Sequence, residues 1–244
     1  MFRFQQFALS QERSAMKVGT DGILLGAWAP LPTAISGQPL RLLDVGTGTG
    51  LIALMLAQRL TAQNAIIYGI EPDAEAAAEA SQNAQNSPWA ERINIFPVSL
   101  QTHRTSFVYD VIVCNPPFFT ANQPTSAHEN RALARHETDF SAEMLFQRAR
   151  ELLHLTGKVC CILPVDRGGH YQQVAQRHGF TLCRQTFVRH SEQHPVKRVL
   201  LCFSREAVDL LSETLVLKQQ VNQQWQDTPE FAALVQDFYL RFAL

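Results

Sequence analysis

Short apolar runs alternate with helix-like segments along most of the chain. Short, mainly apolar runs predict buried strands at 40–45, 65–70, 93–99, 108–114 and 158–163. Between them, apolar residues at helical spacing or alanine-rich stretches predict helices at 51–60, 73–86, 141–154 and 170–178. This alternation favours a doubly wound α/β sheet of mostly parallel strands, which binds ligands at the carboxyl ends of its strands.

Both ends of the chain add to this pattern. Residues 180–190 and 196–204 are adjacent apolar segments separated by a polar turn, so they predict an antiparallel hairpin that closes a seven-stranded sheet. A short apolar helix at 23–29 is expected near the start, with Thr20 or Asp21 as its N-cap. A strand near 215–217 and a helix begun by Thr228-Pro229 are expected to finish the chain. We therefore expect one domain, with its core at 37–206 and short additions at 1–36 and 207–244.

Composition bounds the class of protein. The chain has 244 residues, 46% hydrophobic and 18% charged, which are globular values. The net charge of −1 gives no argument for nucleic acid, but residues 165–205 carry seven Lys or Arg against two acids. That segment is either a phosphate-facing surface or an ordinary solvated face.

Cysteine usage and the N-terminus bear on location. None of the five cysteines lies in a CxxC pair, and all fall in apolar runs, so we expect buried free thiols in a reducing compartment and no metal site. The first residues lack the apolar region of a signal peptide, and no run approaches membrane-spanning length. These features predict a cytoplasmic protein that needs no membrane.

The most informative stretch is Asn115-Pro116-Pro117-Phe118, directly after the strand at 108–114. Each proline fixes its own φ and disfavours a helical conformation for the residue before it, so the chain leaves the strand extended. Its carbonyl groups and the Asn115 amide then provide acceptors for an amino group, and Phe118 provides a flat face for a planar ring. The alternative is an ordinary turn that contains the two prolines, with Phe118 packed in the hydrophobic core.

A glycine-rich loop, Gly46-Thr47-Gly48-Thr49-Gly50, lies between the strand at 40–45 and the helix at 51–60. Glycines at such a turn let the backbone approach a ligand closely. The nicotinamide fingerprint would need a third glycine at position 51, which is Leu51, so a pyrophosphate-binding turn is disfavoured. Asp44, just before the loop, offers a carboxylate to a cationic or hydroxyl-bearing ligand.

Glu71 follows the second strand, at 65–70. An acid at this position is well placed to hydrogen-bond both hydroxyls of a ribose, although it can also cap the helix that follows. The glycine loop, Glu71 and Asn115 all come at carboxyl ends of predicted parallel strands. We therefore expect them to form one site.

These motifs together resemble those of the class I, S-adenosylmethionine-dependent amino-methyltransferases, over roughly residues 15–205. The resemblance implies a Rossmann-like fold and S-adenosylmethionine as cofactor, bound by Asp44, Gly46, Thr47, Gly48, Gly50 and Glu71. It also implies that Asn115, Pro116 and Phe118 position the amine for methylation, with Pro117 beside the substrate. Such enzymes often carry an acid after the third strand to hold the cofactor adenine. Here Ser99 is the candidate contact, which can form a hydrogen bond but not an ionic one, and the alternative is a contact to the backbone.

Finer features resemble the bacterial tRNA methyltransferases that modify adenine N6 just 3′ of the anticodon in a valine tRNA. They are the segments 16–21, 134–137, 228–231 and 237–239. The resemblance implies a tRNA anticodon stem-loop as partner. We expect a monomer or a weak homo-oligomer, although no feature of the sequence indicates the oligomeric state. Lys17, Thr20 and Asp21 are expected to close over the cofactor. The candidate contacts for tRNA phosphates are Arg131, Arg135, Arg189, Lys197 and Arg198.

Other readings remain open at this point. A protein glutamine methyltransferase would use the same Asn-Pro-Pro device, but it would be expected to carry an N-terminal helical domain. A ribosomal guanine N2 enzyme often has a duplicated domain, and DNA adenine methylation usually needs an added recognition domain. Outside this class, the chain could be a catalytically silent cofactor- or RNA-binding module.

Overall fold

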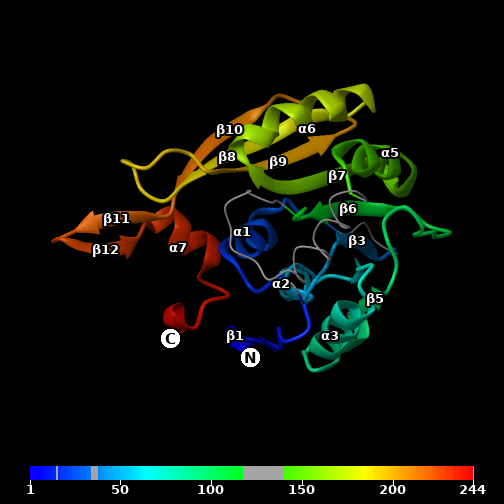
Figure 1. Ribbon diagram of the computed structural model, residues 1–244, viewed down its shortest axis with the longest axis horizontal. Helices are drawn as coiled ribbons and strands as arrows, with labels where there is room; N and C mark the ends of the chain where they lie inside the picture. Colours follow the sequence, from blue (N-terminus) through cyan, green and yellow to red (C-terminus); the bar gives the residue numbers. More distant parts are fainter. Residues whose placement is uncertain (15, 34–37, 118–139, 244) are drawn as a thin grey trace, which may run out of the picture.

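The computed structural model describes residues 1–14, 16–33, 38–117 and 140–243 (Figure 1). In these ranges the main sheet has eight strands, in the order β10-β8-β9-β7-β6-β3-β4-β5. In chain order they are β3 (Leu40–Val45), β4 (Ala65–Ile70), β5 (Ile93–Phe96), β6 (Tyr109–Cys114), β7 (Leu153–Pro164), β8 (Thr181–Arg189), β9 (Arg198–Ser204) and β10 (Leu211–Val216). Only β9 is antiparallel to its neighbours. This is the predicted doubly wound α/β fold.

Helices cover both faces of the sheet, and each face has its own apolar cluster (Figure 1). One cluster contains residues of α1 (Thr20–Trp28), α2 (Leu51–Arg59) and α7 (Pro229–Val235). The other contains residues of α5 (Ala142–Leu152) and α6 (Val165–Arg177). Strand residues alternate between them, with Leu42 in the first cluster and Leu43 in the second. The central strands are therefore buried on both faces, as their near-continuous apolar sequences predict.

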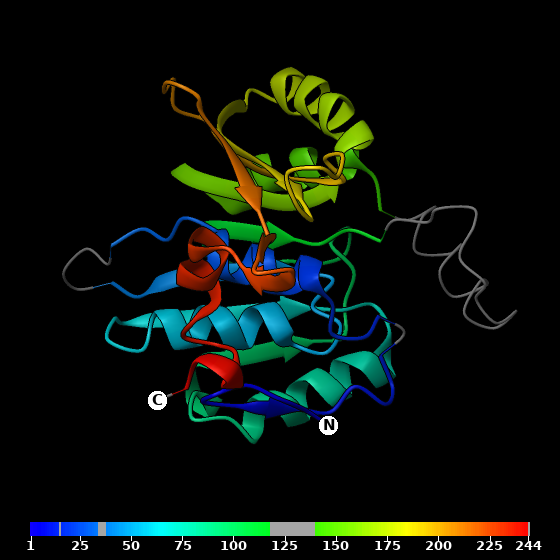
Figure 2. The same ribbon diagram turned by 90° about the vertical axis from the view of Figure 1, so that its left-hand side faces the viewer.

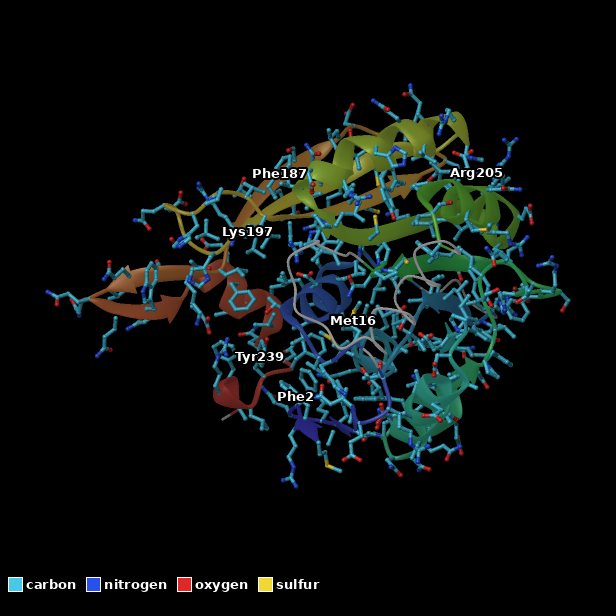
Figure 3. The ribbon with its side chains drawn as sticks, viewed as in Figure 1. Phe2, Met16, Phe187, Lys197, Arg205 and Tyr239 are labelled. Atoms are coloured by element: carbon cyan, nitrogen blue, oxygen red, sulfur yellow. The ribbon has the colours of Figure 1, made fainter. Side chains whose placement is uncertain are left out.

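The two ends of the chain pack together (Figure 2). A small ribbon of β1 (Phe2–Arg3) and β2 (Ala8–Leu9) starts the chain, and the 3-10 turn Leu240–Phe242 ends it. The Gln5 side chain donates hydrogen bonds to the carbonyls of Gln236 and Tyr239, at 2.6 and 2.8 Å. Figure 3 shows Phe2 and Tyr239 on these neighbouring segments.

Several predicted details need correction. Neither Thr20 nor Asp21 caps α1, because the N-cap is the extended residue Gly19 and no side chain caps this helix. The predicted hairpin exists as the β8–β9 pair, but it does not close the sheet, since β9 lies between β7 and β8 and β10 adds an eighth strand. The third strand ends at Phe96, earlier than the predicted 99.

An unpredicted hairpin follows β10. It consists of β11 (Lys218–Val221) and β12 (Gln224–Asp227), joined by Asn222 and Gln223, which both have positive φ. A two-residue connection of this kind matches the twist of the strands it joins. Figure 1 shows this hairpin projecting from the body of the molecule. None of the helices in the described ranges is long and apolar enough to cross a membrane.

Candidate active site

Three strands end in register at the centre of the sheet. Val45, the last residue of β3, pairs with Ile70 of β4 on one side and with Cys114 of β6 on the other. The residues that follow, Gly46, Glu71 and Asn115, therefore leave the sheet at one level. The loop is also tied to β4, since the N–H groups of Gly46 and Thr47 both donate to the Ile70 carbonyl, at 2.9 and 3.0 Å.

The glycine loop has the backbone conformation that its sequence requires. Gly46, Gly48 and Gly50 have φ of +69°, +53° and +81°, a region that other residues rarely adopt. A Cβ atom on Gly46 would meet nothing within 4 Å, whereas one on Gly50 would contact Ala80 at 3.4 Å. Gly46 therefore borders open space at the end of the sheet, while Gly50 allows α2 to pack closely against α3 (Ala74–Gln85).

Asp44 is fully buried beneath this loop. Its Oδ2 accepts hydrogen bonds from the Thr47 hydroxyl at 2.6 Å and from the Ala53 N–H, in the first turn of α2, at 3.2 Å. Burial raises the pKa of Asp44 to about 7, although both hydrogen bonds favour the ionised form. Its Oδ1 has no hydrogen-bond partner among the described residues. Asp44 and Thr47 thus shape the loop, and one buried carboxylate oxygen remains for a donor.

Glu71 is oriented by the backbone on both sides. Its Oε2 accepts from the Gly48 N–H and its Oε1 from the Asp73 N–H, each at 3.1 Å. The sequence left open whether Glu71 caps the helix that follows it. The N-cap of α3 is instead Asp73, whose side chain accepts a hydrogen bond from the Ala76 N–H at 2.8 Å. Because each carboxylate oxygen can accept more than one hydrogen bond, this fixed geometry suits the two hydroxyls of a ribose.

Asn115 lies at the end of β6, and Pro116 and Pro117 follow it without helical structure. The Asn115 Nδ2 donates to the sulfur of Met16 at 3.7 Å, which directs the Oδ1 of the same amide away from Met16. The chain thus presents a side-chain carbonyl next to backbone that prolines hold extended. Phe118 lies outside the described residues, so its stacking role stays a prediction.

The sequence did not reveal what holds the N-terminal segment over this site. Glu79 of α3 is buried and accepts hydrogen bonds from Ser10 Oγ and from the N–H groups of residues 12, 13 and 14, at 2.7 to 3.2 Å. Asn83, one turn later, bonds both Ser10 and the Thr49 carbonyl. A signal for this contact was present in the sequence: Glu79 and Asn83 lie four residues apart, which places two polar side chains on one face of an alanine-rich helix.

Lys17, Thr20 and Ser99 are further predicted cofactor residues, and the side chains of Lys17 and Ser99 form hydrogen bonds within the protein. Lys17 donates to the carbonyls of Gln11 and Ser14, and Thr20 is exposed at the start of α1. Ser99 lies in a turn, where its hydroxyl bonds that of Thr102 at 3.0 Å. Their roles toward a cofactor stay predictions.

The predicted RNA contacts fall into separate groups. Arg189 pairs with Glu192, and Arg198 pairs with Asp21 at 2.7 Å, so a candidate RNA residue and a candidate cofactor residue neutralise each other. Lys197 is exposed, and its ammonium group makes no ion pair with the described residues. Arg131 and Arg135 lie outside the described ranges.

The groups at this edge suit S-adenosylmethionine. Glu71 provides fixed acceptors for ribose hydroxyls, and the open space beside Gly46 admits a ligand close to the backbone. The unpartnered Asp44 Oδ1 provides a further acceptor close by, which suits the ammonium end of the cofactor. The hydrogen-bond acceptors and the open space at this site therefore agree with the expected cofactor.

Comparisons with known proteins agree with this architecture. The methyltransferase small domain family matches residues 29–183. A predicted O-methyltransferase from Agrobacterium tumefaciens superposes with a TM-score of 0.60 at 15% identity, covering 88% of this chain and 95% of its own. A TehB-like SAM-dependent methyltransferase from Corynebacterium glutamicum gives 0.50 at 18% identity, covering 77% and 89%. At these identities the likeness shows the fold.

Curated relatives are much more similar in sequence. A protein of Trichodesmium erythraeum named tRNA1(Val) (adenine(37)-N6)-methyltransferase is 40% identical, covering 99% of this chain and 98% of its own. A Klebsiella pneumoniae protein of the same name is 41% identical, covering 98% and 94%. Each match extends over nearly the whole chain, including both of its ends. The chain therefore belongs to the methyltransferase small domain family and, within it, to the family of the tRNA1(Val) (adenine(37)-N6)-methyltransferases.

Proposed function

We propose that this chain transfers a methyl group from S-adenosylmethionine to N6 of the adenine just 3′ of the anticodon in a valine tRNA. The observation that carries the proposal is the in-register ending of β3, β4 and β6, which brings the glycine loop, Glu71 and Asn115 to one edge. The names of relatives about 40% identical over nearly the whole chain support the substrate. A tRNA substrate implies a cytoplasmic location.

The cofactor supplies an electrophilic methyl group on a sulfonium. Glu71 and the glycine loop would hold it at the edge of the sheet where Asn115 would bind the substrate amine. The protein's own contribution is positioning, which can supply several kcal/mol of the barrier. Asp44 carries no step itself but shapes the loop through Thr47 and Ala53.

Adenine N6 is a poor nucleophile because its lone pair is delocalised into the ring. Hydrogen bonds from N6–H to the Asn115 side-chain carbonyl and to the Pro116 backbone carbonyl favour a pyramidal, more localised nitrogen. The prolines keep these acceptors from turning into a helix. No dedicated base is needed, since the methylated amine is acidic and loses its proton to water. An adenine in an anticodon loop is already unpaired, which lowers the cost of extruding it.

The test is labelled-methyl transfer to an unmodified valine tRNA transcript, followed by nucleoside analysis. We expect N6-methyladenosine in that transcript and none when its adenine 37 is replaced by guanine. Ribosomal RNA and a release factor serve as competing acceptors, and label in either of them would overturn the substrate. Asn115→Ala should abolish transfer while S-adenosylmethionine still binds, and Asn94→Ala, an exposed position on β5, should have no effect.

A further inference from the structure

A second surface lies on the same edge of the sheet as Asn115. Because β8 and β10 run parallel to β6, their carboxyl ends at Arg189 and Val216 point the same way as Cys114. The loop 190–197 and the β11–β12 hairpin follow these ends directly. With strands about 4.8 Å apart, the three spacings from β6 to β8 amount to roughly 15 Å, and Arg189 lies four residues beyond Gln185, the residue of β8 level with Cys114, which adds roughly 13 Å along the strand. The surface therefore begins roughly 20 Å from the end of β6, a separation that a partner of nucleic-acid size spans.

The surface carries an aromatic cluster. Trp225 of β12 is 50% exposed, and its ring lies 5.7 Å from that of His190. The His190 ring in turn lies 5.1 Å from that of His194, nearly perpendicular to it. A large aromatic side chain that is supported by other rings and still half exposed offers a flat face to a ligand.

These rings are held in place by the protein itself. The Lys218 N–H donates to the His190 carbonyl at 2.8 Å, which ties the hairpin to the loop 190–197. Within the loop, Ser191 Oγ bonds His194 Nδ1 at 2.7 Å, and the His194 N–H donates to the Ser191 carbonyl at 3.0 Å. The aromatic cluster is thus preorganised, which reduces the entropy lost when a ligand binds.

Charge and hydrogen-bonding groups surround the cluster. Lys197, in the same loop, is exposed and without an ion-pair partner among the described residues, and Figure 3 shows it close to the base of the hairpin. Arg189 and Arg198 are already paired with acidic side chains, so this surface is not simply a patch of unpaired positive charge. Glutamines dominate the hairpin, at positions 219, 220, 223, 224 and 226, and their amides both donate and accept.

We propose that Trp225, supported by His190 and flanked by Lys197, forms a platform on which an unpaired base of the RNA substrate stacks outside the catalytic site. This inference rests on the proposed function. Bases in RNA loops are unstacked and pack on aromatic side chains, and a neighbouring lysine binds the phosphate between them. The occupant is therefore the anticodon loop of the RNA whose adenine enters the Asn115 site.

The experiment measures binding of an anticodon stem-loop transcript and, separately, kcat and KM for its methylation. Trp225→Ala should weaken binding and raise KM by about tenfold, the loss expected for one stacked base, with kcat within about twofold of the wild type. Trp225→Phe should restore most of the affinity, and Lys197→Gln should weaken it less and flatten its salt dependence. Affinity for S-adenosylmethionine should not change in any variant. Leu155→Ala, an exposed apolar position at the start of β7, is the matched control.

The outcomes separate this inference from the proposed function. Wild-type methylation of the stem-loop with unchanged binding by Trp225→Ala would overturn the platform and leave the function standing. Tight RNA binding that depends on Trp225, without methylation of any RNA, would support the platform and overturn the proposed function. If Trp225→Ala instead abolished a concentration-dependent self-association seen by sedimentation, with RNA binding unchanged, the face would be a protein interface and the platform would be wrong.

Discussion

The side-chain amide of Asn115 donates a hydrogen bond to the sulfur of Met16, 3.7 Å away and 99 residues earlier in the chain. This contact fixes which end of the amide faces Met16 and therefore which end remains for the substrate. The segment before α1 thus orients the residue that the resemblance identifies as catalytic.

Replacing the sulfur tests this relationship. Met16→Leu keeps the size of the side chain but removes the acceptor, so the Asn115 amide loses its orientation. A weak hydrogen bond of about 0.5–1 kcal/mol predicts a two- to fivefold lower kcat for tRNA methylation, with little change in KM. Met144→Leu, on α5, is the matched control. Equal kcat in both variants would contradict the orienting role.

Gly46 and Gly179 provide a matched pair for testing the cofactor site. Both have positive φ, +69° and +79°, and a Cβ atom at either would meet nothing within 4 Å. An alanine at each position should cost a similar 1–2 kcal/mol of unfolding free energy, because the backbone strain is the same. Only Gly46→Ala places a methyl group in the space expected for S-adenosylmethionine.

We therefore expect Gly46→Ala to weaken S-adenosylmethionine binding at least tenfold in a calorimetric titration, while Gly179→Ala binds as the wild type does. Thermal unfolding of both variants checks that their stabilities fall together. A similar loss of affinity in both would mean that general destabilisation, not occupied space, is responsible.

The sequence was sufficient for the central sheet and insufficient for its surroundings. The short apolar runs ending at Val45, Ile70 and Cys114, each followed by turn residues, predict buried strands, so the order of motifs along the chain placed Gly46, Glu71 and Asn115 at one edge. Contacts between distant segments left little local pattern beyond the polar pair Glu79 and Asn83 on α3. Asp21 could not be assigned to Arg198, 177 residues later, because its position at a helix start equally suits a cap. The β11–β12 hairpin was missed because its glutamine-rich strands lack apolar alternation.

Asp44 should make stability depend on pH in an unusual direction. Its pKa rises from 3.8 to about 7 on folding, so the folded state holds the proton more tightly than the unfolded state. Its contribution to stability is therefore complete below about pH 4, is lost as pH rises to about 7, and is constant above that.

Asp44→Asn keeps an oxygen for Thr47 and Ala53 and cannot ionise. Urea unfolding between pH 4 and 8 should show the variant gaining stability relative to the wild type as pH rises, with equal values near pH 4. A constant difference across this range would show that Asp44 does not titrate there. S-adenosylmethionine affinity should nevertheless fall in the variant at pH 8, since we expect the Asp44 carboxylate to attract the cofactor's ammonium group and the variant lacks that charge.

Glu79 is expected to control the segment that lies over the glycine loop. Burial alone would raise the pKa of Glu79, but hydrogen bonds from Ser10 and from three backbone N–H groups outweigh it and lower the pKa. The stabilisation is therefore present above the ordinary pKa of 4.5 and is lost as pH falls through the lower folded value. Glu79→Gln removes the charge and one acceptor oxygen, which should cost about 1–3 kcal/mol of unfolding free energy at pH 7.

Because the segment 10–14 depends on this carboxylate, local opening should increase more than global unfolding. Trypsin should cut Glu79→Gln after Arg13 and Lys17 faster than it cuts the wild type, under conditions in which both proteins remain folded. Affinity for S-adenosylmethionine should also fall in Glu79→Gln, because the segment contacts the glycine loop: Ser14 Oγ lies only 3.4 Å from the position of a Cβ on Gly48. Glu75→Gln, exposed on the same helix, should change neither. Unchanged cleavage at Arg13 in the Glu79 variant would mean that other contacts hold this segment in place.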